Sequence, residues 1–193
     1  MARPSLRLLS LTLFILYSAD MIKSTVPTNF IEASCSATRH PELCVKSLSI
    51  HANAIQKNPY ILTQTALTVS MALAESTKAN MLKLTSIKGL KAPEYGALKD
   101  CLDQIDDSVD RLSQSIREIE KLSEAQGEDF MWHKSNVQTW SSSALTDIKT
   151  CEEGFSGQTL DGKIKASVQG QVTNVEQLIS NALALIKQCE AKH

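Results

Sequence analysis

The sequence predicts an all-α protein: an antiparallel four-helix bundle preceded by a short α-hairpin and stapled by two disulfides. Apolar residues recur at alternating steps of three and four in four long segments, as in helices that bury one face. The breaks between these segments are short, so consecutive helices should lie side by side and run antiparallel. The 193 residues include only 7 Gly, 5 Pro and 5% aromatic residues, which disfavours an all-β sandwich.

Residues 1–24 have the pattern of a secretory signal peptide. Two arginines give a basic start, and residues 8–17 form an apolar run. That run is shorter than the roughly 20 residues that a membrane-spanning helix needs, so a membrane anchor is the less favoured interpretation. We therefore expect a secreted domain at residues 25–193, with no membrane association once the signal has been removed.

A helical hairpin is predicted first, at about residues 29–54. Pro41 suits the first turn of its second short helix, because proline fits where a helix has no intrahelical N–H partner to lose. Cys35 and Cys44 flank the turn, and export makes disulfides the default state of cysteines. Short helices are only marginally stable alone, so a Cys35–Cys44 disulfide would stabilise the hairpin, by about 2–3 kcal/mol.

The four bundle helices follow in order along the chain. Their apolar stripes are Leu62, Ala66, Val69 and Leu73; Leu98, Leu102, Ile105, Val109, Leu112, Ile116 and Ile119; Val137, Trp140, Ala144, Ile148 and Cys151; and Ile164, Val168, Val172, Val175, Ile179, Ala182 and Ile186. Breaks at residues 88–93, 126–129 and 154–157 separate them. Phe130, Met131 and Trp132 follow the second break in an expected turn, where they either cap the bundle or stand exposed as binding anchors.

The remaining cysteines suggest a second staple. Cys101 falls on the second bundle helix and Cys151 at the end of the third, and a bridge between adjacent antiparallel helices is geometrically natural. Four cysteines allow three pairings, of which we favour Cys35–Cys44 with Cys101–Cys151 because local closure favours the first pair. Cys189 is left over on the apolar face of the last helix. A buried free thiol is favoured there over an intermolecular bridge.

Charge and motifs exclude several functions. The formal net charge is −1, and removing residues 1–24 takes away three basic residues and one acidic residue, leaving a mildly acidic domain. This balance argues against nucleic-acid binding and suits a basic protein partner. The four histidines are scattered and no Cys-x2-Cys pair occurs, so no metal site is expected. No nucleophile elbow, phosphate loop or dinucleotide fingerprint is present, so we expect neither a cofactor nor an enzyme.

The second bundle helix carries an acidic face formed by Asp103, Asp106, Asp107 and Asp110. Paired carboxylates perform acid–base catalysis only in a cleft that shifts their pKa values. On an exposed helix they form either a solvated face or a patch that attracts a basic partner. We keep these two interpretations and set catalysis aside.

Several blocks, in their order and spacing, together resemble one family. They are Cys35…Thr38…Pro41…Cys44; Ala97-Leu98-Lys99-Asp100-Cys101 continuing to Asp107-Ser108-Val109; Val137-Gln138-Thr139-Trp140-Ser141-Ser142-Ser143-Ala144-Leu145-Thr146 followed by Thr150-Cys151-Glu152-Glu153-Gly154-Phe155; and Ser180-Asn181-Ala182-Leu183-Ala184-Leu185. The chain resembles the plant invertase/pectin methylesterase inhibitor family over its expected mature length. The resemblance implies the bundle with its hairpin and the cysteine pairing above. The chain departs from the family pattern at Ser143, where the family usually has Ala. We expect Ser143 to face inward.

The resemblance also separates two branches. Invertase inhibitors of this family carry Pro-Lys-Phe before the third bundle helix, whereas residues 128–133 here lack that motif. The block at residues 137–146 is more similar to the pectin methylesterase inhibitors. In that branch, the resemblance implies that bundle helices cover the substrate cleft of the esterase in a one-to-one complex.

The leading hypothesis is therefore a secreted, monomeric inhibitor of pectin methylesterase in the plant cell wall and apoplast. It would act by steric occlusion. The expected interface residues lie on the outer sides of the third and second bundle helices: Gln138, Ser142 and Thr146, and Asp103, Asp107 and Asp110. The alternatives are inhibition of cell-wall or vacuolar invertase, and a structural extracellular protein of the same fold with no enzyme target.

Overall fold

The computed structural model describes residues 28–156 and 162–190, and every regular element within them is a helix. The expected signal peptide, residues 1–24, lies outside the described residues. The elements are the helix at residues 28–35, α2 (Pro41–Leu48), the 3₁₀ turn η1 (Ser49–His51), α3 (Ala52–Ile55), α4 (Pro59–Leu84), α5 (Ala92–Leu122), α6 (Gly127–Gly154) and α7 (Gly162–Gln188). None of the described helices combines the length and apolar content that crossing a bilayer requires.

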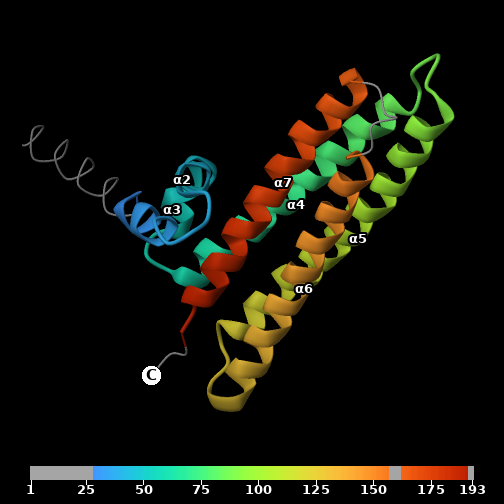
Figure 1. The fold of residues 1–193 in the computed structure, drawn as a ribbon. Coiled ribbons are helices and arrows are strands. Elements are labelled where there is room, and N and C mark those ends of the chain that lie inside the picture. The colour runs from blue at the N-terminus through green and yellow to red at the C-terminus, as the bar shows by residue number, and fades with distance from the viewer. Residues whose placement is uncertain (1–27, 157–161, 191–193) are drawn as a thin grey trace, which may run out of the picture.

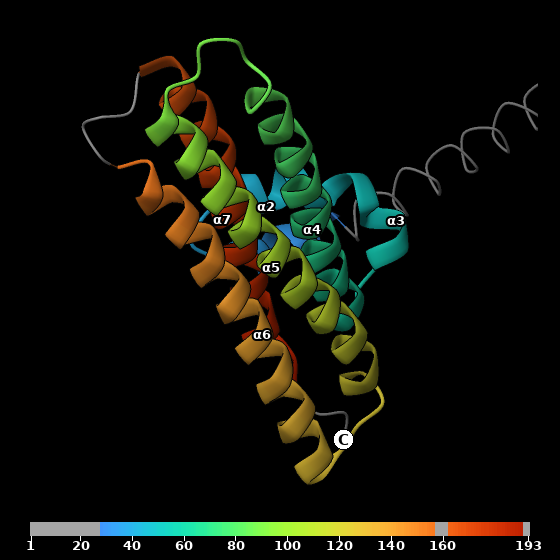
Figure 2. The same cartoon turned by 90° about the vertical axis from the view of Figure 1, so that its right-hand side faces the viewer.

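The four long helices form an antiparallel bundle, so the fold class predicted from the sequence is confirmed (Figure 1). Each helix packs on the next along the chain, and α7 closes the bundle by packing on both α4 and α6. The N-terminal hairpin lies on the α4–α7 side, as Figures 1 and 2 show from two directions. The hairpin therefore leaves the outer face of the α5–α6 pair uncovered.

Local sequence fixes where the bundle begins. Asn58 precedes α4, and its side-chain oxygen accepts hydrogen bonds from the backbone N–H groups of Tyr60 and Ile61. These are donors that the first helical turn leaves unpaired. Pro59 occupies the first position of the helix, where a missing N–H costs nothing. The result is a firm joint between the hairpin and the bundle.

The hairpin is held by one disulfide and two amide side chains. Cys35 and Cys44 are bonded, with their Cα atoms 5.6 Å apart. Asn181, on α7, accepts from the backbone N–H of His40 and donates to its carbonyl, each at 2.9 Å. Gln188 donates to the carbonyl of Ser34 at 2.9 Å. Contacts between residues 141 and 154 positions apart thus dock the hairpin on the last helix.

Replacing the buried Asn181 by alanine should destabilise the protein by about 2 kcal/mol, because the His40 N–H would lose its partner and the His40 carbonyl would keep only its bond from the Cys44 N–H. The free energy of unfolding from urea denaturation measures this. Asn80→Ala is the matched control, since this exposed amide bonds only to other exposed side chains. A loss below about 0.5 kcal/mol for Asn181→Ala would contradict the proposed docking role.

The core face of α4 differs from the stripe predicted for it. Leu62 and Ala66 are buried as expected, but Val69 and Leu73 are only half-buried. Their places in the core are taken by the buried row Thr63, Leu67, Ser70, Ala74, Thr77 and Met81. Thr63 and Ser70 donate to backbone carbonyls one turn earlier, at 2.8 Å each. Their hydroxyls can be buried because they are satisfied within the helix, which a hydrophobic pattern does not detect.

The start of α6 also corrects an expectation. The predicted break at residues 126–129 lies earlier in the structure, at residues 123–126, because α5 ends at Leu122 and α6 already begins at Gly127. Phe130, Met131 and Trp132 consequently lie on the helix and not in a turn. Phe130 is buried, whereas Met131 and Trp132 are 64% and 67% exposed. The capping interpretation therefore fits Phe130, and the interpretation as an exposed binding anchor is left for Met131 and Trp132.

Small side chains bring α5 and α6 close together. Cys101 and Cys151 are bonded, with Cα atoms 4.4 Å apart. Ser108 donates to the carbonyl of Ala144 at 3.1 Å, and the hydroxyls of Ser115 and Ser141 pair at 3.1 Å. Residues 101, 108 and 115 are spaced by seven, so they fall on one side of α5. This seam fixes the two helices relative to each other.

A buried carboxylate closes the other end of the seam. Glu118 on α5 accepts from Asn136 at 2.8 Å, pairs with the His133 ring at 2.7 Å and accepts from Lys121 at 3.1 Å. Burial alone would raise the pKa of Glu118, but the hydrogen bonds from these three side chains outweigh it and lower the pKa to about 2. Glu118 therefore stays negatively charged in acidic surroundings. With the disulfide at one end and this network at the other, α5 and α6 are held together at both ends.

Candidate functional site

A shallow groove runs along the outer side of the α5–α6 pair. Its volume is about 550 Å³. One α5 residue, Arg111, lines it together with seven residues of α6: Ser135, Gln138, Thr139, Ser142, Ser143, Thr146 and Asp147. Because the disulfide and the Glu118 network tie the two helices at either end, the groove is a rigid surface rather than a gap between mobile elements.

The three α6 residues predicted for an interface all line this groove. Ser142 and Thr146 are exposed, and Gln138 is half-buried. Ser143, expected to face inward, is half-buried and also lines the groove. The groove wall is thus formed mainly by hydroxyl and amide groups, which offer hydrogen bonds to a partner surface.

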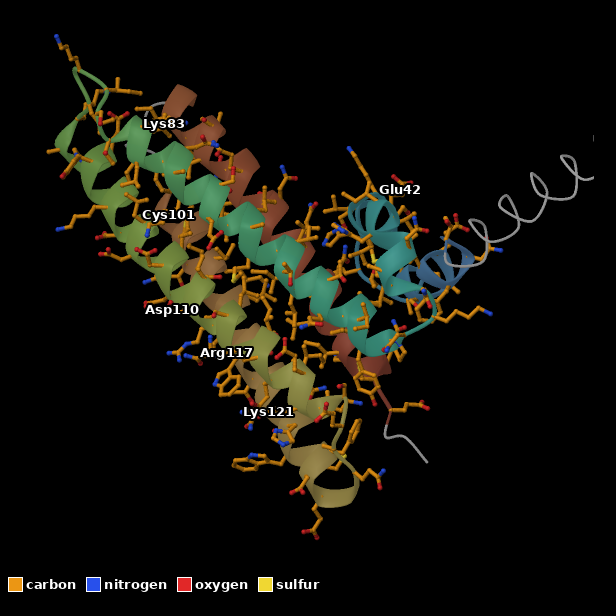
Figure 3. The ribbon with its side chains drawn as sticks, turned by 180° about the vertical axis from the view of Figure 1, so that it is seen from behind. Glu42, Lys83, Cys101, Asp110, Arg117 and Lys121 are labelled. Atoms are coloured by element: carbon orange, nitrogen blue, oxygen red, sulfur yellow. A yellow bond between two sulfur atoms is a disulfide. The ribbon has the colours of Figure 1, made fainter. Side chains whose placement is uncertain are left out.

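The acidic residues predicted on α5 divide into two sets. Asp103, Asp107 and Asp110 are exposed, and Asp107 is close enough to the groove to act electrostatically on Asp147. Asp106 instead pairs with Lys78 of α4, on the other side of the helix. Figure 3 follows α5 from Cys101 past Asp110 to Arg117 and Lys121. Of the four acidic residues, Asp107 is therefore the one that interacts with a groove residue, and Asp103 and Asp110 are exposed on the same helix.

Four groove residues were not predicted from the sequence: Arg111, Ser135, Thr139 and Asp147. Of these, Asp147 is the half-buried one. Its oxygen Oδ2 is buried and accepts no hydrogen bond from the described residues. Burial raises the pKa of Asp147 and the carboxylate of Asp107 raises it further, while Arg111 opposes the shift. Its position four residues before Cys151 puts it on the seam side of α6. The four-residue spacing to Cys151 was the signal available in the sequence. It did not single out Asp147, because an aspartate on a polar helix face is ordinarily solvated.

The groove continues toward the disulfide. A second depression of about 450 Å³ lies farther along the same pair of helices, lined by Pro93, Gly96, Ala97, Asp100, Cys101 and Gln104 of α5 and by Thr150, Cys151 and Gly154 of α6. Its walls are made of small side chains. The two depressions together give the α5–α6 pair an extended recessed surface that suits a protein partner better than a small molecule.

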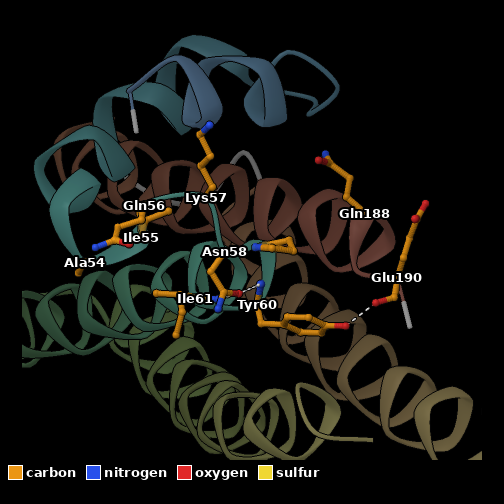
Figure 4. Close-up of a pocket in the computed structure, with 10 residues that line it drawn as sticks. Ala54, Ile55, Gln56, Lys57, Asn58, Tyr60, Ile61, Gln188 and Glu190 are labelled. Atoms are coloured by element: carbon orange, nitrogen blue, oxygen red, sulfur yellow. Dashed lines mark hydrogen bonds between the residues drawn. The ribbon is translucent and has the colours of Figure 1, made fainter. Parts of the chain in front are cut away.

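A third depression lies at the joint between the hairpin and the bundle (Figure 4). The connection from α3 to α4 and the end of α7 line it, and none of the predicted interface residues is there. Tyr60 donates its hydroxyl to the carbonyl of Glu190 across it. Its polar groups hold the end of α7 in place, so we assign it a structural role.

Cys189 is a free, buried cysteine in the structure. Its sulfur lies 3.4 Å from the hydroxyl of Thr63. Burial raises the pKa of the Cys189 thiol, and the Thr63 hydrogen bond and the Lys134 charge only partly oppose this. The thiol is therefore neutral and shielded. Across residues 28–156 and 162–190, no three His, Cys, Asp or Glu side chains gather as a metal site would require.

The comparison with known protein families covers nearly the whole described fold. A sequence model of the family described as plant invertase/pectin methylesterase inhibitor matches residues 29–185, which include the hairpin and nearly all of the bundle. The chain belongs to this family. The branch of the inhibitor family is suggested by individual relatives, and the fold by solved structures.

Two relatives of the inhibitor family illustrate the match. The chain is 48% identical over 171 residues to the 21 kDa protein of Daucus carota, covering 88% of this chain and 89% of that protein. It is 46% identical to pectinesterase inhibitor 11 of Arabidopsis thaliana, covering 89% and 86%. A crystal structure of a mutant form of a pectin methylesterase inhibitor from Arabidopsis matches with a TM-score of 0.65 at 18% identity, covering 82% of this chain and 95% of that one. At that identity the structural match shows the shared fold.

Family membership also gives meaning to the start of α6. Residues 128–133 occupy the place where the sequence comparison above put the Pro-Lys-Phe motif of invertase inhibitors. In this inhibitor-family chain they form the first turns of α6, and Phe130 is buried against the core. The Phe130 ring is therefore not available at the surface, whereas Met131 and Trp132 of the same segment are exposed.

Proposed function

We propose that the chain is a secreted inhibitor of plant pectin methylesterase that blocks the pectin-binding cleft by forming a one-to-one complex. The observation that carries this proposal is the identity of 45–46%, over nearly the whole domain, to two Arabidopsis thaliana proteins named pectinesterase inhibitors. The recessed, polar α5–α6 surface supports it, because its hydroxyl and amide groups form a rigid face that offers hydrogen bonds to a partner protein.

The proposed mechanism needs no chemistry from the inhibitor. The hydroxyl and amide groups at Gln138, Ser142 and Thr146 hydrogen-bond to the rim of the esterase cleft, and the helices exclude pectin by their bulk. The carboxylates of Asp107 and Asp110 attract basic esterase surface and raise the association rate. The rigid seam reduces the ordering cost of binding, because the contact face is already formed.

The proposed location is the apoplast and cell wall. Residues 1–24 would direct export, and the two disulfides suit an oxidising compartment. The protein would act as a monomer there, since its apolar bundle faces are already satisfied internally. Inhibition of cell-wall or vacuolar invertase is the second candidate, and a structural extracellular protein the third.

Titration of the purified protein against a panel of plant pectin methylesterases, with methanol release as the readout, tests the proposal. Stoichiometric inhibition of at least one isoform is the expected result. A parallel sucrose-hydrolysis assay with acid invertases separates the second candidate. Full esterase activity across a panel that includes basic isoforms would exclude the proposed target, and inhibition of invertase alone would reassign it.

Acidification should strengthen the complex through Asp147. Burial already raises the pKa of this carboxyl in the free protein, and covering the groove removes more water and raises it further. The complex then takes up a proton, so affinity increases as the pH falls from the higher, bound pKa towards the free one. Each unit of difference gives about a tenfold change in Kd.

The measurement is Kd between about pH 7 and pH 4.5 for the wild type and for Asp147→Asn, which keeps the neutral form at every pH. The variant should bind with a flatter pH profile. Asp103→Asn is the control, because this exposed carboxylate does not line the groove. An unchanged pH profile in Asp147→Asn would assign the dependence to other groups.

A further inference from the structure

Trp132 is an exposed tryptophan in a place that the fold does not explain. Its side chain is 67% exposed on α6, and its neighbour Met131 is 64% exposed. Phe130, two residues before Trp132, already supplies the buried ring that packs this end of the bundle. A large aromatic surface left in water contributes little to folding, so the position of the indole needs another reason.

Helix geometry connects Trp132 to the groove. The residues Trp132, Ser135, Thr139, Ser142 and Thr146 follow one another at alternating steps of three and four on α6, and all five are exposed. Residues at this spacing share one helix face. The last four line the groove. Trp132 therefore extends the groove surface by one turn, and this row spans roughly 20 Å at 1.5 Å per residue.

The other large exposed apolar side chains lie away from this row. Ile50, the most exposed at 82%, is on η1 in the hairpin, and Leu82, Ile87 and Tyr95 surround the connection from α4 to α5, at the opposite end of the bundle. Figure 1 shows that the start of α6 and the α4–α5 connection lie at opposite ends. Among the described residues, the exposed ring that is continuous with the groove is Trp132.

The charges beside Trp132 indicate the chemistry of its partner. Glu128 and Asp129 are exposed and lie four and three residues before it, on the same side of α6. Farther along, Asp107 is exposed on α5 and close enough to act electrostatically on the groove residue Asp147. An aromatic ring with acidic neighbours is complementary to an apolar pocket with a basic rim, and tryptophan is enriched among the residues that dominate binding energy.

We propose that Trp132 is the apolar anchor of this inhibitor, inserting into an apolar, basic-rimmed pocket on pectin methylesterase beside the cleft that the groove residues cover. This inference rests on the proposed function and adds the residue that sets residence time. The anchor slows dissociation, whereas the neighbouring carboxylates speed association.

The test is the binding kinetics of the full chain and its variants with a purified, basic plant pectin methylesterase, alongside inhibition measured by methanol release. Trp132→Ala should weaken Kd by about 30-fold or more, mainly through faster dissociation. Trp132→Phe should recover most of the loss, because it restores an aromatic ring. Glu128→Gln combined with Asp129→Asn should instead slow association and reduce its salt dependence.

Ile50→Ala is the matched control, since it also removes a highly exposed apolar side chain but lies off the groove. It should leave Kd within twofold. Unfolding curves of all variants should coincide with the wild type. Unchanged affinity in Trp132→Ala while groove variants lose binding would overturn the anchor and leave the proposed function intact.

Two further outcomes are decisive. A wild-type protein that inhibits no esterase would remove the proposed function itself, and the anchor with it. A change of oligomeric state in Trp132→Ala during sedimentation, without any change in inhibition, would show that a second copy of this chain covers the ring and would also overturn the anchor.

Discussion

Ser142→Arg should lower the affinity for pectin methylesterase by at least about 100-fold and leave the fold intact. Ser142 is exposed at the middle of the exposed α6 row that lines the groove, so a longer side chain there extends into solvent and not into the core. In the complex the same side chain would lie between the two surfaces. It would separate them sterically, and it would add a positive charge facing the basic surface that we expect on the partner.

The matched control is Ser76→Arg, the same change at an exposed serine of α4. Methanol release in a titration with wild-type, Ser142→Arg and Ser76→Arg proteins gives the three affinities, and circular dichroism checks that each is helical. Inhibition by Ser142→Arg within about threefold of the wild type would show that the groove is not the contact surface.

Removing the Cys101–Cys151 bridge should cost about 4 kcal/mol of folding stability. The bond closes a loop of 50 residues, and a longer closed loop removes more conformational entropy from the unfolded chain. The bridge also ties α5 to α6 beside the groove, so its loss should loosen the contact face. Because domains are stable by only about 5–15 kcal/mol, the double variant Cys101→Ser/Cys151→Ser should unfold at much lower urea.

Removal of the hairpin bridge is the comparison. Cys35→Ser/Cys44→Ser opens a separation of only nine residues, and the same relation gives about 3 kcal/mol. The order of the two losses, measured by urea denaturation without reductant, is the informative result. A larger loss for the hairpin bridge would show that docking of the hairpin, and not loop closure in the bundle, dominates stability.

Some residues of the groove could be predicted from the sequence and others could not. Gln138, Ser142 and Thr146 were predicted because they lie opposite the apolar stripe of a helix, and outward positions on a regular helix follow from its period. Asp147 was not predicted. Burial raises its pKa, Asp107 across the seam raises it further and Arg111 opposes the shift, and these effects depend on how α5 packs against α6.

The core of α4 shows the same limit in the interior. Hydrophobic periodicity assumes that buried positions are apolar, and it therefore selected Val69 and Leu73. The structure buries Thr63, Ser70 and Thr77 instead. For Thr63 and Ser70, a hydrogen bond within the helix removes the cost of burying the hydroxyl.

The sequence alone determined the class of this protein: four amphipathic helices, a hairpin before them and paired cysteines in a chain with an export signal pattern. These features follow from local periodicity and residue chemistry, so they can be predicted from the sequence. Only the tertiary structure decided which surface is rigid and uncovered, that Asn181 holds His40, and that Trp132 is continuous with the groove. Such features arise from contacts between residues distant in sequence, and the desolvation that those contacts cause has no local signature.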